Sequence, residues 1–192
     1  MTSAGLVNEI NLIQDVKAEP DAFAPVYEYY FPKVYNYVRY RVEDAQVTDD
    51  LTSQIFEQAL GKIYSYKADV SPFGAWLFAI ARNKVSDYFR KKKRRRWFSW
   101  DAMEGYTSDY PALDESTQLK DDQMQLLRAV SQLTGRERDV IALKFAADMT
   151  NVQISQLTGL SESNVGVILY RAIRKLRGML HGLFHDDEEV QS

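Results

Sequence analysis

Seven consecutive basic residues, at positions 90–96, give this sequence its strongest chemical signal. They close a segment in which apolar residues from Phe73 to Tyr88 recur at helical spacing, so one face of the predicted helix can pack on a core. Another face carries polar and charged side chains at offsets of 0, 3, 4 and 7, namely Asn83, Ser86, Asp87 and Arg90. Clustered Lys and Arg side chains bind phosphates because each contact releases condensed counterions. Since a few cations would suffice to complement a helix dipole, the run favours nucleic acid over a solvated helix end.

A second candidate DNA-binding segment lies near the C-terminus. Thr150 and Gln153 have capping-box spacing, Gly159 lies in a predicted turn, and Ser161 is placed to cap a last helix. In a helix-turn-helix motif the first residues of the second helix reach base edges, and later cations hold phosphates. Here these are Glu162, Ser163, Asn164 and Val167 for bases, and Arg171, Arg174, Lys175 and Arg177 for phosphates. Many helical hairpins with a glycine turn bind no DNA, so a purely structural hairpin is the alternative.

Helical periodicity also covers the N-terminal part of the chain. A short helix is predicted over about residues 5–17, and a longer apolar stripe follows over residues 23–38. Pro32 lies inside this stripe, so a break or kink is expected there. Thr48 is expected to cap the next helix, which runs to about Leu60.

Two further helix starts frame the middle of the chain. A loop is predicted over residues 65–71, after which Ser71 and Pro72 are placed to cap and begin the basic helix. Residues 97–122 have no helical period and carry seven acidic residues against one basic residue, which predicts an acidic linker. The helical pattern resumes at Gln123, and Thr134 with Glu137 has capping-box spacing for a further helix.

These elements predict an all-α protein with two small helical domains joined by an acidic flexible linker. The expected organisation is an N-terminal extension at 1–20, a domain at 21–96, the linker at 97–122, a helix-turn-helix domain at 123–180, and an acidic tail at 181–192.

The composition narrows the possible classes of protein. The 192 residues carry a net charge of only −3, although basic and acidic residues are segregated along the chain. The absence of cysteine excludes disulfides and cysteine-based zinc sites. No apolar run is long enough to span a bilayer and no signal-peptide pattern begins the sequence, so we expect a cytoplasmic protein without membrane insertion. No phosphate-cradling glycine loop, metal cluster or nucleophile–base motif is present, which predicts no cofactor, no metal and no catalysis.

The ordered set of segments resembles the extracytoplasmic-function (ECF) sigma factors of bacterial RNA polymerase, within the sigma-70 family. In the N-terminal part, FAPVYEYYFPKVYNYV, DDLTSQIFEQAL and FGAWLFAIARNKVSDYFRKKKRRR resemble sigma region 2 in order and spacing. In the C-terminal part, LTGRERDVIALKF and ISQLTGLSESNVGVILYRAIRKLR resemble region 4. The resemblance implies a region 2 helical bundle, a region 4 helix-turn-helix, and a function in directing the polymerase to promoters and opening them.

The resemblance also implies roles for particular residues. The face that docks on the clamp helices of the polymerase β′ subunit corresponds to Asp49, Asp50, Ser53, Gln54 and Glu57. The reader of the opened −10 element corresponds to Lys67, Arg82, Asn83, Ser86, Asp87, Arg90, Lys91, Arg94 and Arg95. The helix over residues 161–177 corresponds to the reader of the −35 duplex, and the acidic linker to the connector in the polymerase channel.

The sequence departs from the family pattern at two places. Ser53 and Gln54 stand where the family usually has Gln-Glu, so clamp binding is expected to rely more on Asp49, Asp50 and Glu57. Residues 166–168, Gly-Val-Ile, stand where the family commonly shows Lys-Ser-Arg, so two cationic contacts to the −35 element are missing.

The expected partners are core RNA polymerase through its β′ and β subunits, promoter DNA, and an anti-sigma factor, with the free chain a monomer or bound 1:1 to its partner. Two other functions stay open at this point. A polymerase-independent helix-turn-helix regulator would bind specific DNA on its own. A sigma-like adaptor would bind a partner without reading promoters, and the departures at residues 54 and 166–168 favour it.

Overall fold

The computed structural model describes residues 9–42, 44–98 and 118–184, and every regular element in these ranges is helical. The all-α prediction is therefore confirmed. The N-terminal elements are α1 (Glu9–Ala18), η1 (Pro20–Phe23), α2 (Ala24–Arg41), α3 (Ala45–Gly61), η2 (Ile63–Ser65) and α4 (Phe73–Phe98). The C-terminal elements are α5 (Gln118–Ser131), α6 (Gly135–Phe145), α7 (Asn151–Thr158) and α8 (Glu162–Phe184).

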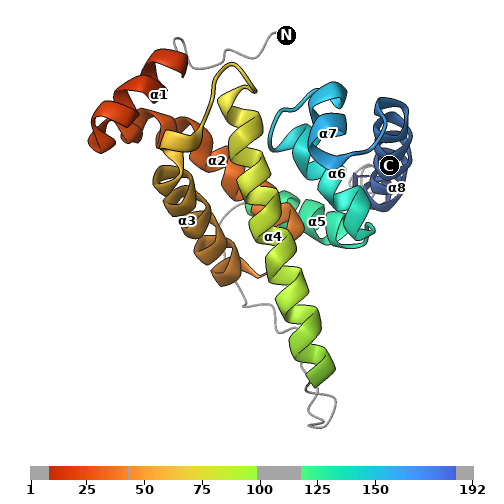
Figure 1. The fold of residues 1–192 in the computed structure, drawn as a ribbon. Helices are drawn as coiled ribbons and strands as arrows, with labels where there is room; N and C mark the ends of the chain where they lie inside the picture. The colour runs from red at the N-terminus through yellow and green to blue at the C-terminus, as the bar shows by residue number, and fades with distance from the viewer. Residues whose placement is uncertain (1–8, 43, 99–117, 185–192) are drawn as a thin grey trace.

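Helices α2, α3 and α4 pack around a shared apolar interior, with α1 against one end (Figure 1). Val34 and Tyr37 of α2, Ile55 of α3 and Leu77 of α4 are fully buried there. Burial of such side chains stabilises each by about 1.5–3 kcal/mol relative to exposure. The far end of α4 projects beyond the other helices, and this end carries the basic run (Figure 1).

The predicted break at Pro32 is wrong, because α2 continues through this residue without interruption. A proline inside a helix costs about 3 kcal/mol through a lost hydrogen bond and a steric clash. Buried side chains lie on both sides of it, including Tyr30 and Val34. Pro32 and Glu28 are themselves exposed, so water can reach the carbonyl left without a donor. The burial on both sides outweighs the local penalty.

Thr48 does not cap α3, contrary to the sequence prediction. The cap is Asp44, whose Oδ1 accepts a hydrogen bond from the Val47 backbone N–H at 2.9 Å. Thr48 is buried one turn into the helix, where its hydroxyl donates to the Asp44 carbonyl at 2.8 Å. Because Asp is a better N-cap than Thr, the earlier residue sets the helix start.

Three other boundaries differ from those expected. Helix α4 begins at Phe73, and the Pro72 carbonyl accepts from the Trp76 N–H at 3.2 Å, so Pro72 precedes the helix. Residues 97–98 belong to α4 and residues 118–122 to α5, although all of them were assigned to the linker. Acidic residues favour a helix N-terminus, and Asp121 and Asp122 lie in the first turns of α5. Residues 99–117 lie outside the described ranges, as do residues 5–8 of the first predicted helix and residues 185–192 of the predicted acidic tail.

The C-terminal helices begin where the capping boxes were predicted. Thr134 caps α6 and Thr150 caps α7, each with the reciprocal side-chain bond from the third helical residue. Gly159 ends α7 with φ at 73°, a left-handed conformation that glycine adopts without steric cost. The Ser161 hydroxyl then accepts from the Asn164 N–H at 3.2 Å and starts α8, which runs to Phe184 and thus beyond the boundary expected at 180.

The C-terminal helices lie against the N-terminal ones in this structure (Figure 1). Helix α6 packs along α2, and α7 contacts α4. The buried apolar residues form one continuous cluster that includes Tyr37 from α2 and Val140 from α6. The sequence predicted two helical units and carried no signal of how they pack together.

Candidate nucleic-acid interface

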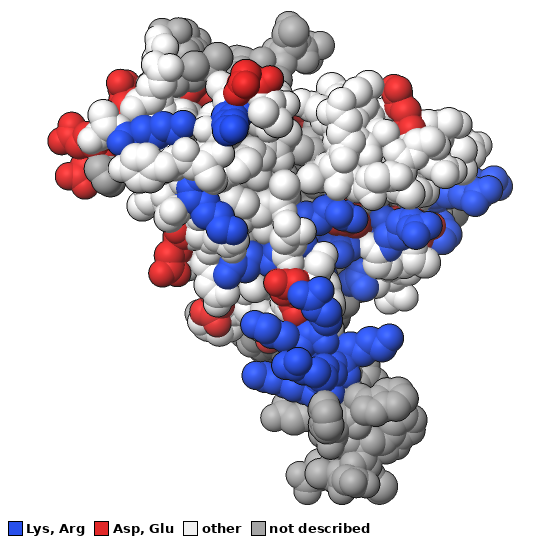
Figure 2. All heavy atoms as spheres, viewed as in Figure 1, with Lys and Arg blue, Asp and Glu red and all other residues white. Residues whose placement is uncertain are grey.

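The polar face of α4 and its basic end form one solvent-exposed strip. Asn83, Ser86 and Arg90 are exposed, as are the side chains of residues 91–95. Figure 2 shows Lys and Arg side chains gathered around the projecting end of this helix. Lys91, Arg94 and Arg95 therefore lie where the sequence analysis expects phosphate contacts. A strip of this charge density attracts a polyanion and makes binding strongly dependent on salt.

Asp87 reduces the positive charge of this strip at one point. Its Oδ1 lies 2.6 Å from Nη2 of Arg90, one turn further along α4. Both side chains are largely exposed, and such surface pairs contribute about 0–1 kcal/mol to stability. The pair can therefore open readily and release Arg90 to a phosphate.

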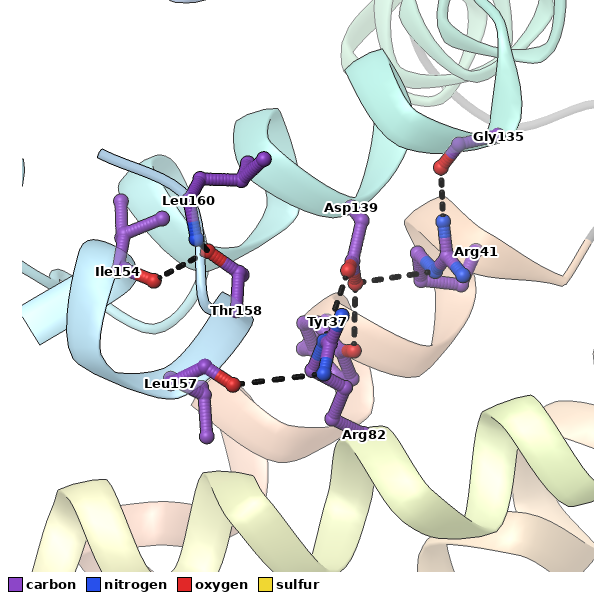
Figure 3. Close-up of polar contacts among 9 residues, drawn as sticks. All are labelled: Tyr37, Arg41, Arg82, Gly135, Asp139, Ile154, Leu157, Thr158 and Leu160. Carbon is purple, nitrogen blue, oxygen red and sulfur yellow. Dashed lines mark hydrogen bonds and ion pairs between the residues drawn. The ribbon is translucent and has the colours of Figure 1, made fainter. Parts of the chain in front are cut away.

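Arg82 is separated from the other predicted −10 residues. Its Nε donates to Asp139 Oδ2 at 2.9 Å, and its Nη1 donates to the Leu157 carbonyl at 3.4 Å (Figure 3). Only 31% of the side chain is exposed. The guanidinium is thus occupied by the C-terminal helices and does not face solvent with the rest of the strip.

The loop before α4 holds Lys67 at the surface on a rigid support. Tyr66 is buried, its hydroxyl donates to the Ser71 carbonyl at 3.0 Å, and its own carbonyl accepts from Lys17 Nζ at 2.8 Å. Tyr64 and Val70 on either side of Lys67 are exposed apolar residues, at 69% and 74%. Sequence reasoning did not single them out, because isolated apolar residues in a predicted loop carry no periodic signal.

Trp76 supports this loop from α4. Its ring lies 5.5 Å from that of Tyr66 and 5.4 Å from that of Phe73, between centroids. The side chain is half-buried against the core, as the apolar stripe predicted.

Helix α8 presents its first turns to solvent and its other side to α6 and α7. Val165, Leu169 and Ala172 are buried against the C-terminal core. The exposed side carries every predicted DNA contact of this helix, namely Glu162, Ser163, Asn164, Val167, Arg171, Arg174, Lys175 and Arg177. A shallow hollow beside these residues is lined by Arg136 of α6 together with Asn164, Val167 and Arg171.

Two apolar residues are exposed on this face. Val167 is 42% exposed and Tyr170, which sequence reasoning missed, is 68% exposed. Gly166 precedes them, and a Cβ atom built on it would meet no atom within 4 Å. Packing within the described part of the chain therefore does not require glycine at position 166.

Lys175 is engaged within the C-terminal helices. Its Nζ lies 2.7 Å from Oε1 of Glu137, the residue that completes the cap of α6. Burial acts to raise the pKa of the Glu137 carboxyl. The hydrogen bonds from Lys175 and from Thr134 act in the opposite direction and together outweigh burial, so the pKa is lowered. Lys175 thus braces α8 against α6 in this structure.

The predicted polymerase face occupies one side of α3. All five of its residues are exposed, namely Asp49, Asp50, Ser53, Gln54 and Glu57. The opposite side of the helix buries Leu51, Ile55 and Phe56. Next to it on α2, the rings of Tyr27 and Phe31 lie 4.7 Å and 6.3 Å from the Phe56 ring, and both residues are more than a third exposed. An acidic helix face beside exposed aromatic rings is suited to a protein partner.

One cluster joins the two halves of the molecule, and sequence reasoning did not find it. Asp139 of α6 meets Tyr37 and Arg41 of α2 and Arg82 of α4 (Figure 3). Burial raises the pKa of the Tyr37 hydroxyl, and the Asp139 carboxylate raises it further, so this hydroxyl stays protonated and donates. No group of three or more potential metal ligands occurs among the described residues, and no helix in these ranges is long and apolar enough to cross a bilayer.

Two family models match the chain in the order of its two helical halves. Sigma-70 region 2 matches residues 26–95, and Sigma-70, region 4 matches residues 123–176. The ECF RNA polymerase sigma factor BldN of Streptomyces coelicolor is 30% identical over 172 residues, which cover 89% of this chain and 65% of BldN. The ECF RNA polymerase sigma factor SigM of Bacillus subtilis is 26% identical over 162 residues, which cover 84% of this chain and 97% of SigM.

Solved structures share the fold. The sigma factor RpoE in complex with the anti-sigma factor NepR, from Bartonella quintana, is similar with a TM-score of 0.67 at 22% identity, over 83% of this chain and 96% of that one. CnrH in complex with the cytosolic domain of CnrY is similar with a TM-score of 0.66 at 21% identity, over 90% and 96%. With both sigma regions matched in order and the fold shared, the chain belongs to the sigma-70 family of RNA polymerase sigma factors, within its ECF group.

Proposed function

We propose that this chain is an alternative sigma factor, which binds core bacterial RNA polymerase and directs promoter recognition and opening at initiation. The observation that carries this proposal is the match to both sigma regions in one chain, in order. Relatives such as SigM, of which this chain covers 97%, are themselves named as ECF sigma factors.

Polymerase binding is assigned to the exposed side of α3. Asp49, Asp50 and Glu57 keep three carboxylates there, although Gln54 lacks the charge that the family usually has. Their partner is the clamp-helix surface of the β′ subunit, while the C-terminal helices meet the β subunit. The exposed rings of Tyr27 and Phe31 beside α3 supply apolar area to the same contact.

The −10 element is assigned to α4 and the loop before it. Residues 90–95 hold the backbone of the opened strand, and Asn83 and Ser86 face it from the preceding turns. Unpaired bases stack on aromatic side chains without requiring a particular sequence. Tyr64 is an exposed ring beside Lys67, and we assign it this role.

The −35 element is assigned to α8, which enters the major groove with its first two turns. Asn164 can form paired hydrogen bonds with adenine, and Val167 can contact the methyl group of thymine. Arg171 and Arg174 follow as phosphate contacts. Residues 21–96 and 123–180 thus act as the two promoter-reading domains, with the acidic segment between them in the polymerase channel.

The chain itself performs no catalysis in this proposal. Nucleotide and magnesium chemistry belongs to the polymerase, and the protein acts in the cytoplasm, where the polymerase and the chromosome are. Sigma factors are regulators of initiation, which is consistent with the absence of a catalytic constellation from the sequence.

An anti-sigma partner is part of the proposal. RpoE, which shares this fold, was solved in complex with the anti-sigma factor NepR. We expect a comparable protein to bind this chain 1:1 and cover the α3 face. A pull-down of the tagged chain from uninduced cells should recover it, and recovery of polymerase subunits alone would count against such a partner.

A reconstituted run-off assay tests the function. The purified chain is combined with core bacterial RNA polymerase on a pool of genomic promoter fragments, and the 5′ ends of the transcripts are sequenced. Defined start sites with shared upstream motifs are expected. Co-elution with polymerase without transcripts would favour the sigma-like adaptor, and neither co-elution nor transcripts would favour a polymerase-independent DNA-binding regulator.

A further inference from the structure

The Asp139 cluster brings three donors from the N-terminal helices to one carboxylate of the C-terminal helices. The Tyr37 hydroxyl donates to Oδ1 at 2.9 Å, and Arg82 Nε donates to Oδ2 at 2.9 Å. Arg41 Nε lies 3.5 Å from Oδ1 as an ion pair, and its Nη1 donates to the Gly135 carbonyl (Figure 3). Tyr37 precedes Asp139 by 102 positions in the sequence and Arg82 precedes it by 57, yet both bond to its carboxylate.

Two of the three donors, Tyr37 and Arg41, also make contacts within the N-terminal helices. The Tyr37 ring packs edge-on against Phe78, with 5.7 Å between ring centroids. The Arg41 guanidinium lies over the Phe89 ring, 5.7 Å from its centroid. Both aromatic residues belong to α4, as does Arg82. Tyr37 and Arg41 therefore keep these contacts if the C-terminal helices leave, and with Arg82 on the same helix as their supports they form a candidate anion site.

The Asp139 carboxylate does not satisfy this site fully. Arg41 Nε is buried and makes no hydrogen bond among the described residues, although its side chain is only 10% exposed. Its contact with Asp139 is the 3.5 Å ion pair alone, and a buried donor without a well-formed hydrogen bond costs up to about 1–3 kcal/mol. A phosphate group offers more oxygen acceptors than a carboxylate, and arginine pairs suit it because each guanidinium presents donors in a rigid fork.

We propose that Tyr37, Arg41 and Arg82 form a binding site for a backbone phosphate of promoter DNA, which Asp139 occupies as an internal competitor while the C-terminal helices are packed on α2 and α4. Arg82 lies one helical turn before Ser86 and two turns before Arg90, so the site lies on the same face of α4 as the exposed basic strip and would extend it once the C-terminal helices leave. This continuity favours DNA over an acidic protein as the ligand. Closure of the molecule and occupation of the site by DNA then exclude each other.

The proposal rests on the proposed function only in taking DNA as the source of the phosphate. Its main test, oligonucleotide binding, needs neither polymerase nor a promoter sequence. Failure of this inference would therefore be distinguishable from failure of the sigma-factor assignment, which the run-off assay measures.

The experiment measures binding of a fluorescein-labelled single-stranded oligonucleotide to the full chain by anisotropy over a range of salt concentrations. Asp139→Asn keeps the shape of the side chain and removes its charge. The matched control is Asp148→Asn, which removes the same charge from an exposed position at the end of α6, where asparagine tolerates the positive φ of 56°. D139N should bind several-fold more tightly than D148N, with a log K against log salt slope steeper by about 0.7 for one added phosphate contact.

Two further measurements make the result decisive. The double variant D139N/R41A should lose the gain in affinity and the extra salt dependence. Small-angle neutron scattering with the oligonucleotide contrast-matched should show an increase in the radius of gyration of the wild-type protein itself when the oligonucleotide binds, a result that requires no variant to fold. Equal binding by D139N and D148N, a gain that survives R41A, or an unchanged radius in the DNA complex would each overturn the proposal. A gain for core polymerase without a gain for DNA would overturn it too, since the site would then serve an acidic protein surface.

Discussion

Helices α4 and α8 both face solvent with residues assigned to promoter DNA, but they differ in the chemistry that they present. The exposed end of α4 consists almost wholly of Lys and Arg (Figure 2). Apart from Glu162, the first turns of α8 instead present neutral or apolar side chains, among them Asn164, Val167 and Tyr170, and its arginines come later. Charge dominates affinity for nucleic acid, whereas contacts to base edges carry specificity. The difference indicates that α4 supplies salt-dependent affinity and α8 supplies sequence preference.

The largest expected effect follows from removing charge from α4. Replacing Arg90, Arg94 and Arg95 together with alanine should weaken promoter binding by the polymerase complex on the order of 100-fold near physiological salt, because three phosphate contacts are lost. The slope of log K against log salt should become shallower by about 2–3. Filter binding or anisotropy at several salt concentrations measures both quantities.

The control for this variant is Arg128→Ala, which removes an exposed cation of α5 outside both DNA faces. Co-elution with core polymerase should be retained in both variants. Unchanged transcription and salt dependence in the triple variant would contradict the role assigned to the basic run.

A smaller effect should distinguish α8 from α4. If Val167 contacts a thymine methyl group, replacing that thymine with deoxyuridine removes one buried methyl and weakens binding about fourfold, from about 0.8 kcal/mol. The substitution is scanned through the −35 element once run-off transcripts have located it. V167A should lose the sensitivity at that position and keep the salt dependence of the wild type. A scan in which no thymine methyl matters would contradict apolar base recognition by α8.

Alanine substitutions at Gly166 and Gly159, both in the helix-turn-helix motif, should change the free energy of unfolding in opposite directions. Gly166→Ala should raise the free energy of unfolding by about 1 kcal/mol, since glycine is a poor helix former and the added Cβ meets no neighbour within 4 Å. Gly159→Ala should lower it by about 1 kcal/mol or more, because φ is 73° there. Urea unfolding followed by circular dichroism measures both, and a destabilised G166A would reveal a constraint on this helix that its surroundings do not show.

The smallest expected effect concerns the brace between α6 and α8. The folded pKa of the Glu137 carboxyl lies below its ordinary value of 4.5, so its contribution to stability is present above that pH and is lost as pH falls through the lowered pKa. Glu137→Gln should therefore remove part of the acid destabilisation of the wild type. Urea unfolding from pH 3 to pH 7 tests this, and parallel stability curves for the two proteins would show that the ion pair with Lys175 contributes nothing to pH dependence.

Local features of the fold followed from the sequence, and non-local ones did not. The capping boxes at Thr134 and Thr150 and the turn at Gly159 were predicted because each depends on residues close together in the chain. The break at Pro32 and the cap at Thr48 were wrong because burial on both sides of Pro32 and a better cap at Asp44 decided the outcome.

The same distinction applies to the candidate site. The exposed faces of α3, α4 and α8 lie where helical periodicity placed them, although their binding roles await experiment. The Asp139 cluster could not be predicted, because its donors lie 57 and 102 residues away and no periodic pattern links them. Arg82 was accordingly assigned to DNA alone, and its partner on α6 went unnoticed.

The closed packing limits what the two helices can reach together. Arg82 of α4 bonds the Leu157 carbonyl, and α8 begins five residues later, a stretch of roughly 17 Å when fully extended. The −10 and −35 elements are named for positions about 25 base pairs apart, which is roughly 85 Å of B-form DNA at about 3.4 Å per step. Under the proposed assignment of α4 to the −10 element and α8 to the −35 element, the arrangement in this structure cannot serve both, so we expect the two halves to separate at initiation.

The most direct test is a distance measurement between the two halves in two states. Fluorophores are attached through cysteines at Asn36 of α2 and Gln156 of α7, both exposed, in a chain that has no cysteine of its own. Energy transfer should be high in the free chain and low in the complex with core polymerase and promoter DNA. Equal transfer in the two states would contradict a closed resting form that opens to read promoters.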